Sequence, residues 1–249
     1  MSIFFNNGLR FLKVLDCREA PLNTFPKEIL KLYNLRYLSL RDTNVSSIPK
    51  SIGKLQKLNT VDLRYINVTE LPAEILQLKQ LRQLLVYRYV HRFTTSLEVV
   101  GFKALRGLET LSSLQSLCFI EVDPFECLQA LPNLVHIELV EAYDGETLCF
   151  KADGFKMLKV LLLGKFDRLK RVTIERGTMS SLEKLMLRDC KLLDEVPTGI
   201  ECLSNLKDLE FIDMSNEFLM KLNQRTDLLH ISTIFVGYEA DWGMDGYLI

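Results

Sequence analysis

Residues 35–75 read LRYLSLRDTNVSSIPKSIGKLQKLNTVDLRYINVTELPAEI, and this stretch decides the fold because its apolar pattern returns every 23 residues. Each unit has the form LxxLxLxxxxLxx[LIF]PxxIxxLxx. The first leucine column holds Leu12, Leu35, Leu58 and Leu81. Later in the unit come the columns Pro26, Pro49, Pro72 and Ile29, Ile52, Ile75. So many coincident columns indicate a structural repeat.

The two halves of the unit favour different local structures. In LxL, alternate residues face one side of a strand, so the leucines enter a core. After the proline, apolar residues stand three apart, which suits a helical or 3₁₀ turn with the proline at its first position. One unit cannot bury its apolar face alone, so stacked units must share a continuous core.

The pattern continues at changed spacing beyond residue 88. Strand signals of the same type are Leu114/Leu117/Phe119, Leu134/Ile137/Leu139, Leu158/Leu161/Leu163, Leu182/Leu185/Leu187 and Leu206/Leu209/Phe211. We therefore predict an α/β leucine-rich-repeat solenoid of about nine repeats over residues 1–215. It is expected to be a horseshoe with a parallel concave β-sheet and short helical, 3₁₀ or irregular convex segments. Residues 89–108 form a predicted insertion, and 216–249 a C-terminal cap or tail.

Composition excludes several other classes of protein. The chain has 249 residues, with 31 Lys+Arg against 32 Asp+Glu, and this balance argues against nucleic-acid binding. No apolar run approaches the ~18 residues that span a bilayer. The six cysteines and three histidines are scattered, which favours reduced thiols over a disulfide scaffold or a zinc site. We predict no metal and no cofactor.

The first residues, MSIFFNNGLRFLKVLDC, carry no secretory signal pattern. We therefore expect a cytoplasmic protein, free or at the inner side of the plasma membrane. They also offer no polar cover for the first repeat, although a solenoid end needs one. We expect that the chain starts inside a longer solenoid, or that a partner covers an apolar edge formed by Ile3, Phe4, Phe5 and Phe11.

Three segments strengthen one family resemblance. They are LRYLSLRDTNVSSIPKSIGKLQKL (35–58), EVVGFKALRGLETLSSLQSLCFIEVD (98–123) and EFLMKLNQRTDLLHISTIFVG (217–237). They resemble the leucine-rich-repeat region of intracellular plant disease-resistance receptors of the coiled-coil, nucleotide-binding class. The second resembles that family's mid-domain insertion and following repeat, and the third resembles the end of such receptors.

The resemblance implies a sensor and not a switch. No GxxxxGK[ST] phosphate loop is present, so no nucleotide site can be assigned. The family's repeat region is thought to recognise pathogen effectors, or host proteins that they modify, and to hold the nucleotide-binding switch domain inactive. The implied partners are therefore proteins: an effector or guarded host protein, and the switch domain of a longer receptor.

Two outward columns of the predicted concave face supply the candidate binding residues. One contains Arg18, Arg41, Arg64, Tyr87, Ile120, Val140 and Arg188, and its neighbour contains Asp16, Asp62, Leu85 and Leu162. The arginines form either a docking strip for an acidic partner or a consensus ladder in which Asp and Arg pair. The apolar members Leu85, Tyr87, Ile120, Val140 and Leu162 form a partner site unless the insertion covers them.

Catalysis finds no support in the sequence, because no polar residues converge in a pattern that a reaction needs. We predict a non-enzymatic protein-binding module of plant defence that recognises effectors or guarded proteins and contributes to autoinhibition. The alternative is a stand-alone intracellular leucine-rich-repeat scaffold that assembles signalling proteins.

Overall fold

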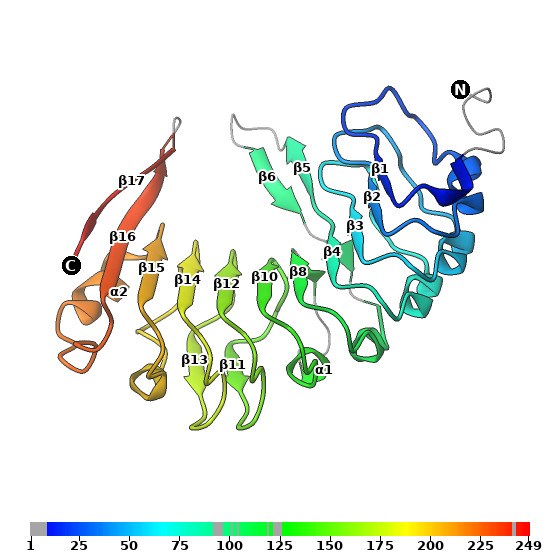
Figure 1. The fold of residues 1–249 in the computed structure, drawn as a ribbon. Helices are drawn as coiled ribbons and strands as arrows, with labels where there is room; N and C mark the ends of the chain where they lie inside the picture. The colour runs from blue at the N-terminus through cyan, green and yellow to red at the C-terminus, as the bar shows by residue number, and fades with distance from the viewer. Residues whose placement is uncertain are drawn as a thin grey trace. The chain divides into compact units, whose positions relative to one another are not determined.

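The computed structural model describes residues 9–91, 97–100, 102–103, 105–118, 120–121, 126–240 and 243–249. The chain divides into two compact units, Met1–Glu121 and Val122–Ile249. Both are leucine-rich-repeat arrays built on parallel strands (Figure 1). Within the described residues, no helix combines the length and apolar character needed to cross a membrane.

The first unit carries five strands of the repeat ladder, in the order β1-β2-β3-β4-β8. They are β1 (Val14–Asp16), β2 (Tyr37–Ser39), β3 (Thr60–Asp62), β4 (Gln83–Leu85) and β8 (Ser116–Cys118). The pairing is parallel, with Leu15 opposite Leu38 and Leu38 opposite Val61. The 23-residue period thus becomes the register of the sheet, and every strand turns the same column toward the core.

Short 3₁₀ turns form the other side of each early repeat. They are η2 (Leu9–Phe11), η3 (Lys27–Lys31), η4 (Lys50–Lys54), η5 (Ala73–Gln77) and η6 (Leu108–Thr110). The proline lies one residue before the turn and not at its first position, as Pro49 before η4 illustrates. Its carbonyl accepts a hydrogen bond from the Ile52 amide at 2.9 Å, and Ile52 is buried. The expected helical or 3₁₀ convex segments are confirmed here.

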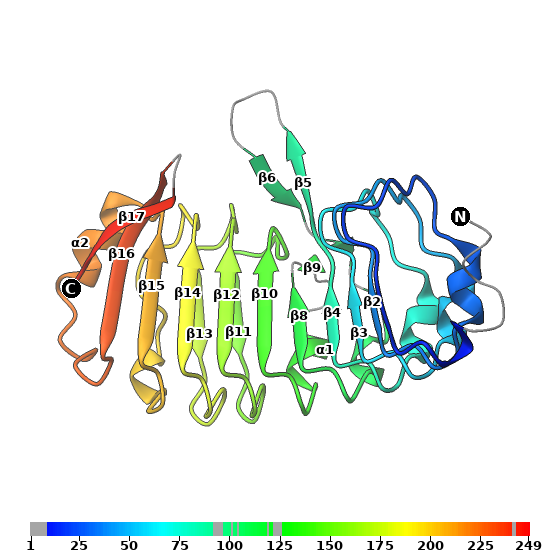
Figure 2. The same cartoon turned by 45° about the horizontal axis from the view of Figure 1, so that its top comes forward.

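The insertion contains an antiparallel hairpin. Its strands are β5 (Arg88–His91) and β6 (Leu97–Val100), and β5 follows β4 almost directly (Figure 2). Next, β7 (Phe102–Lys103) pairs in parallel with β9 (Ile120–Glu121). Hairpin strands on a rigid scaffold are a common place for binding residues.

The second unit continues the ladder in the order β10-β12-β14-β15-β16-β17. These strands are β10 (His136–Val140), β12 (Val160–Gly164), β14 (Lys184–Arg188), β15 (Asp208–Ile212), β16 (Thr233–Ala240) and β17 (Gly243–Leu248). All neighbours pair in parallel except β16 and β17, which are antiparallel. The helices α1 (Glu126–Gln129), η7 (Ile200–Cys202) and α2 (Asn216–Leu222) lie between strands in sequence.

The convex side of the second unit differs from the expected helical or irregular segments. There, β11 (Thr147–Phe150) and β13 (Arg171–Ile174) form a second parallel pair. Both alternate exposed or half-buried residues with buried ones, and Phe150, Val172 and Ile174 are buried. β-Branched and aromatic residues at alternate positions favour a strand over a 3₁₀ turn.

The repeat ladder also extends past residue 215. The nine predicted strands are present, and β16 adds another with Ile234 opposite Leu209. The segment 216–249, predicted as a C-terminal cap or tail, thus includes a strand that continues the parallel ladder. The signal is Ile231-x-x-Ile234-x-Val236, which is the same LxxLxL pattern with β-branched residues in place of leucine. In the described part of this segment, β17 pairs antiparallel with β16 and so departs from the repeat.

Candidate partner-binding surface

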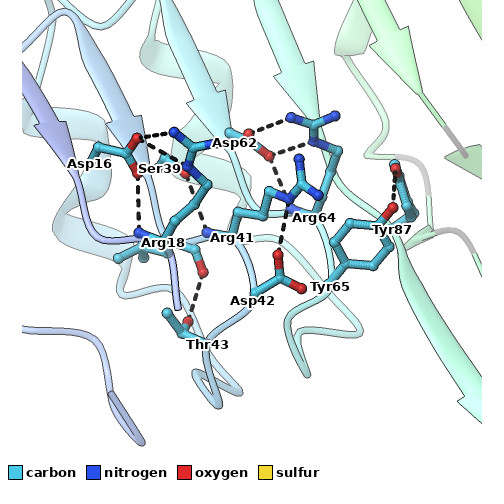
Figure 3. A network of polar contacts seen from close by, with 11 residues as sticks. Asp16, Arg18, Ser39, Arg41, Asp42, Thr43, Asp62, Arg64, Tyr65 and Tyr87 are labelled. Atoms are coloured by element: carbon cyan, nitrogen blue, oxygen red, sulfur yellow. Dashed lines mark hydrogen bonds and ion pairs between the residues drawn. The ribbon is translucent and has the colours of Figure 1, made fainter. Parts of the chain in front are cut away.

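The ladder of the first unit brings the predicted polar residues into two rows. Asp16, Ser39, Asp62 and Leu85 lie opposite one another on adjacent strands. Two residues further along the chain, the second row holds Arg18, Arg41, Arg64 and Tyr87. We call these two rows together the Asp–Arg strip (Figure 3). The register of the first row agrees with the spacing in the sequence, and the binding role of both rows stays a prediction.

After each of the strands β1, β2 and β3, the residue that follows the arginine has a left-handed backbone conformation. Glu19, Asp42 and Tyr65 have φ values of 59°, 55° and 60°. None is glycine, although a left-handed conformation costs most residues about 1–2 kcal/mol. Backbone hydrogen bonds continue through this bend, since the Asp42 amide donates to the Arg64 carbonyl at 3.1 Å. The bend therefore keeps the arginines side by side while the chain leaves the sheet.

Two of the three arginines have a carboxylate two residues earlier in the same repeat. Arg18 donates to Asp16 from Nε and Nη2, with the shortest contact at 2.8 Å. Arg64 donates to Asp62 from Nε at 2.8 Å and from Nη2 at 2.7 Å. Such two-point pairs are the strongest geometry for an arginine and a carboxylate. Within these two pairs, the interpretation of the row as a consensus ladder matches the contacts.

The second repeat departs from this arrangement because Ser39 occupies the aspartate position. The Ser39 hydroxyl accepts a hydrogen bond from the Arg41 amide at 3.4 Å, as Asp62 does from the Arg64 amide at 3.2 Å. The Arg41 guanidinium turns instead to Asp42, with 3.0 Å between Nε and Oδ2. It also lies 5.0 Å from the centre of the Tyr65 ring, a cation–π contact.

Two tyrosines border the strip. Tyr87 and Tyr65 meet with their rings edge to face, 4.9 Å between centroids. The Tyr87 hydroxyl donates to the Tyr65 hydroxyl at 3.0 Å. Burial and this hydrogen bond raise the pKa of Tyr87 above its ordinary value, so its phenol stays protonated. The pair offers aromatic surface next to charge, a combination common at the centres of protein interfaces.

Two of the residues placed in the outward columns are buried and not exposed. Asp62 is only 2% exposed, and Val140, in the second unit, is only 5% exposed. Val140 was expected to be an exposed apolar residue, and that prediction is wrong. A Cβ placed on Gly164, which lies opposite Val140, would be 3.4 Å from a Val140 methyl and from a Leu162 methyl. Both distances are ordinary van der Waals contacts, so Val140 and Leu162 pack close to Gly164.

The other predicted residues have mixed outcomes. Leu85 and Tyr87 in the first unit are half-buried, as are Leu162 and Arg188 in the second. The side chain of Ile120 lies outside the described part of the structure, so its expected role as an apolar contact stays a prediction. The same holds for Ile3, Phe4 and Phe5, whereas Phe11 is exposed as predicted.

A cavity that sequence analysis missed lies in the second unit, with a volume of about 410 Å³. Its lining includes Asp213, Ser215, Leu219, Val236, Tyr238 and Tyr247. Ser215 caps α2 by accepting a hydrogen bond from the Phe218 amide, and the Tyr238 hydroxyl donates to Asp245. The cavity forms where the β16–β17 hairpin and α2 come together, and the repeat pattern does not specify that arrangement.

The carboxylates of the molecule should make it sensitive to acid. Hydrogen bonds lower the pKa of five carboxyl groups. In four of them the main donor is a lysine or arginine side chain, and for Glu175 the main donor is the Ala152 amide. They are Asp16, Glu146, Glu175, Glu183 and Asp227. Their stabilising effect is present above the ordinary values of 3.8 and 4.5 and is lost as pH falls through the lower folded values.

We therefore expect the thermal midpoint to drop on acidification from about pH 5 to pH 3. The drop should be smaller in about 1 M salt, because all these groups are exposed enough to be screened. Thermal unfolding followed by circular dichroism at the two pH values measures it. A thermal midpoint that is constant over this pH range would contradict the stabilising role of these five carboxylates.

Comparison with known proteins matches both the repeat and the fold. A family described as a leucine-rich repeat region matches residues 5–124. Disease resistance protein RPM1 of Arabidopsis thaliana is 35% identical over 153 residues, which are 59% of this chain and 15% of RPM1. Disease resistance protein RPP8 of the same plant is 33% identical over 106 residues, 42% of this chain and 12% of RPP8. The chain thus matches only a small part of these relatives.

Solved structures agree on the fold alone. A leucine-rich-repeat protein of Leptospira interrogans superposes with a TM-score of 0.60 at 23% identity, covering 89% of this chain and 60% of that one. An internalin of Listeria monocytogenes superposes with a TM-score of 0.51 at 18% identity, over 86% and 64% of the two chains.

Proposed function

We propose that this chain, whose first half is a leucine-rich-repeat region of the kind found in plant disease resistance proteins, is a protein-binding module of plant defence. It recognises a pathogen effector or a guarded host protein, and it contributes to holding a nucleotide-binding switch domain inactive. It acts by binding and not by catalysis. The resemblance to intracellular receptors supports a cytoplasmic site of action.

The family match over residues 5–124 carries this proposal, because it coincides with the unit that holds the Asp–Arg strip. The strip supports a binding role by its composition. It joins three arginines to a pair of edge-to-face tyrosines beside strands that pack on a buried core. Arginine and tyrosine are enriched in protein interfaces, and rigid strands reduce the entropy lost on binding.

Two matched double variants test this surface. Arg18→Glu with Arg41→Glu reverses two charges on the strip and leaves Arg64 in place beside buried Asp62. Lys31→Glu with Lys54→Glu makes the same charge change at exposed positions in or beside the 3₁₀ turns, with the same 23-residue spacing. Partners are first captured from leaf tissue before and after pathogen challenge, then purified and titrated against both variants.

We expect the strip variant to weaken binding of a defence-related partner at least tenfold and the turn variant to change it less than twofold. Equal affinities of the two variants would overturn the role of the strip. If challenge changes nothing among the captured proteins, the stand-alone scaffold is the better function. The autoinhibitory part needs a separate assay, in which the chain should slow nucleotide exchange by a switch domain that binds it.

A further inference from the structure

Arg41 differs from the arginines on either side of it. Arg18 and Arg64 each direct Nε and Nη2 to a carboxylate of their own strand. Arg41 donates only through Nε, to Asp42, and its two terminal nitrogens make no hydrogen bond to any described residue. Its side chain is 30% exposed, so water and a partner can both reach the guanidinium.

The cause is the single serine in the aspartate row. Ser39 lies opposite Asp16 on one side and Asp62 on the other. The backbone turn is the same in all three repeats, since each side chain of this row accepts a hydrogen bond from the arginine amide two residues later. The sheet therefore holds three equivalent arginine positions, but it supplies only two of them with a carboxylate in this row.

Neighbouring contacts hold the Arg41 guanidinium in place. Asp42 fixes Nε, and the Tyr65 ring lies 5.0 Å from the guanidinium carbon (Figure 3). Tyr65 is in turn held by the Tyr87 hydroxyl at 3.0 Å. A guanidinium that is already oriented loses little side-chain freedom when it binds, and its planar fork matches a carboxylate.

We propose that the terminal nitrogens of Arg41 receive a carboxylate from the protein partner, an aspartate or glutamate side chain on an exposed segment. This inference rests on the proposed function and names the chemistry of its partner. A carboxylate suits the position because Asp16 and Asp62 make two-point contacts with the equivalent arginines. A phosphate carries more negative charge and would lie close to Asp42 and the neighbouring aspartates, which disfavour it.

Ser39→Asp is the sharpest test, because it gives Arg41 the internal carboxylate that Arg18 and Arg64 already have. Asp62 shows that a buried aspartate is accepted in this row when an arginine pairs with it. Ser39→Asn controls for size without charge. Arg41→Gln removes the guanidinium, and Arg18→Gln removes one that is already paired.

The probe is an acetylated and amidated hexaglutamate peptide, with hexaglutamine and a phosphoserine peptide for comparison. Binding is followed through the arginine Nε–Hε resonances in nitrogen-15 NMR spectra of the full chain. We expect hexaglutamate to shift the Arg41 resonance saturably. Ser39→Asp and Arg41→Gln should each weaken binding at least tenfold, whereas Ser39→Asn and Arg18→Gln should weaken it less than threefold.

Several results would overturn the proposal. One is unchanged affinity in Ser39→Asp, and another is an equal loss in Arg18→Gln and Arg41→Gln. Tighter binding of the phosphoserine peptide would assign the position to phosphate instead. Circular dichroism checks the fold of each variant. If Ser39→Asp does not fold, the difference in peptide affinity between Arg41→Gln and Arg18→Gln decides the question. This titration uses no defence partner, so its result is independent of the partner capture. Either experiment can fail while the other succeeds.

Discussion

Gly199→Ala is expected to lower the free energy of unfolding of the second unit by about 3–5 kcal/mol. Gly199 precedes η7 with φ of +87°, and a Cβ there would lie 2.0 Å from the Ile174 carbonyl oxygen. A backbone oxygen cannot move away as a flexible side chain can. The Ile174 amide also donates to the Thr198 carbonyl at 2.8 Å, so any shift would break the contact between neighbouring repeats.

Gly177→Ala is the matched control. Gly177 has nearly the same backbone angle, φ of +90°, but a Cβ there would meet nothing within 4 Å. It should cost only the conformational strain, about 1 kcal/mol. Urea unfolding followed by circular dichroism measures the loss of stability in both variants. Equal losses would mean that the backbone angle, and not the approach to Ile174, makes glycine necessary.

Arg64→Ala should destabilise the first unit by about 2 kcal/mol, whereas Arg18→Ala should leave its stability nearly unchanged. The two arginines make nearly the same two-point contact. Their aspartates differ in burial, because the side chain of Asp62 is 3% exposed and that of Asp16 is 34% exposed. Removing Arg64 leaves a buried carboxylate unpaired, whereas Asp16 remains hydrated.

A double variant separates charge from packing. Asp62→Asn combined with Arg64→Ala removes both charges and should recover part of the loss, since no buried charge remains. Chemical unfolding of the unchanged protein, Arg18→Ala, Arg64→Ala and the double variant gives the four free energies of unfolding. If Arg18→Ala and Arg64→Ala cost the same, burial does not control the strength of these pairs.

Most of the ladder could be predicted from the sequence. The nine strand signals are all strands, and the described residues of the core columns are buried from the second repeat onward, with Leu38, Leu84, Ile137 and Leu161 all at 0% exposure. This works because a repeat is a local pattern whose period becomes the register between strands. Three elements departed from expectation. The strands β11 and β13 replace predicted helical, 3₁₀ or irregular segments, and β16 has isoleucine and valine where the earlier repeats have leucine.

The candidate site could be predicted only as far as its columns. The sequence by itself determined that Asp16, Ser39 and Asp62 share one row and that the arginines share the next, since spacing alone sets the register. Tertiary structure decided how each charge is used. Among the described strands, β1 with Asp16 pairs with β2 alone, whereas Asp62 on β3 lies between β2 and β4 and is buried. Neighbours in space set burial, which is why the two Asp-x-Arg sequences yield one exposed pair and one buried pair. In the Ser39 repeat the sequence itself differs, and the terminal nitrogens of Arg41 make no hydrogen bond to any described residue.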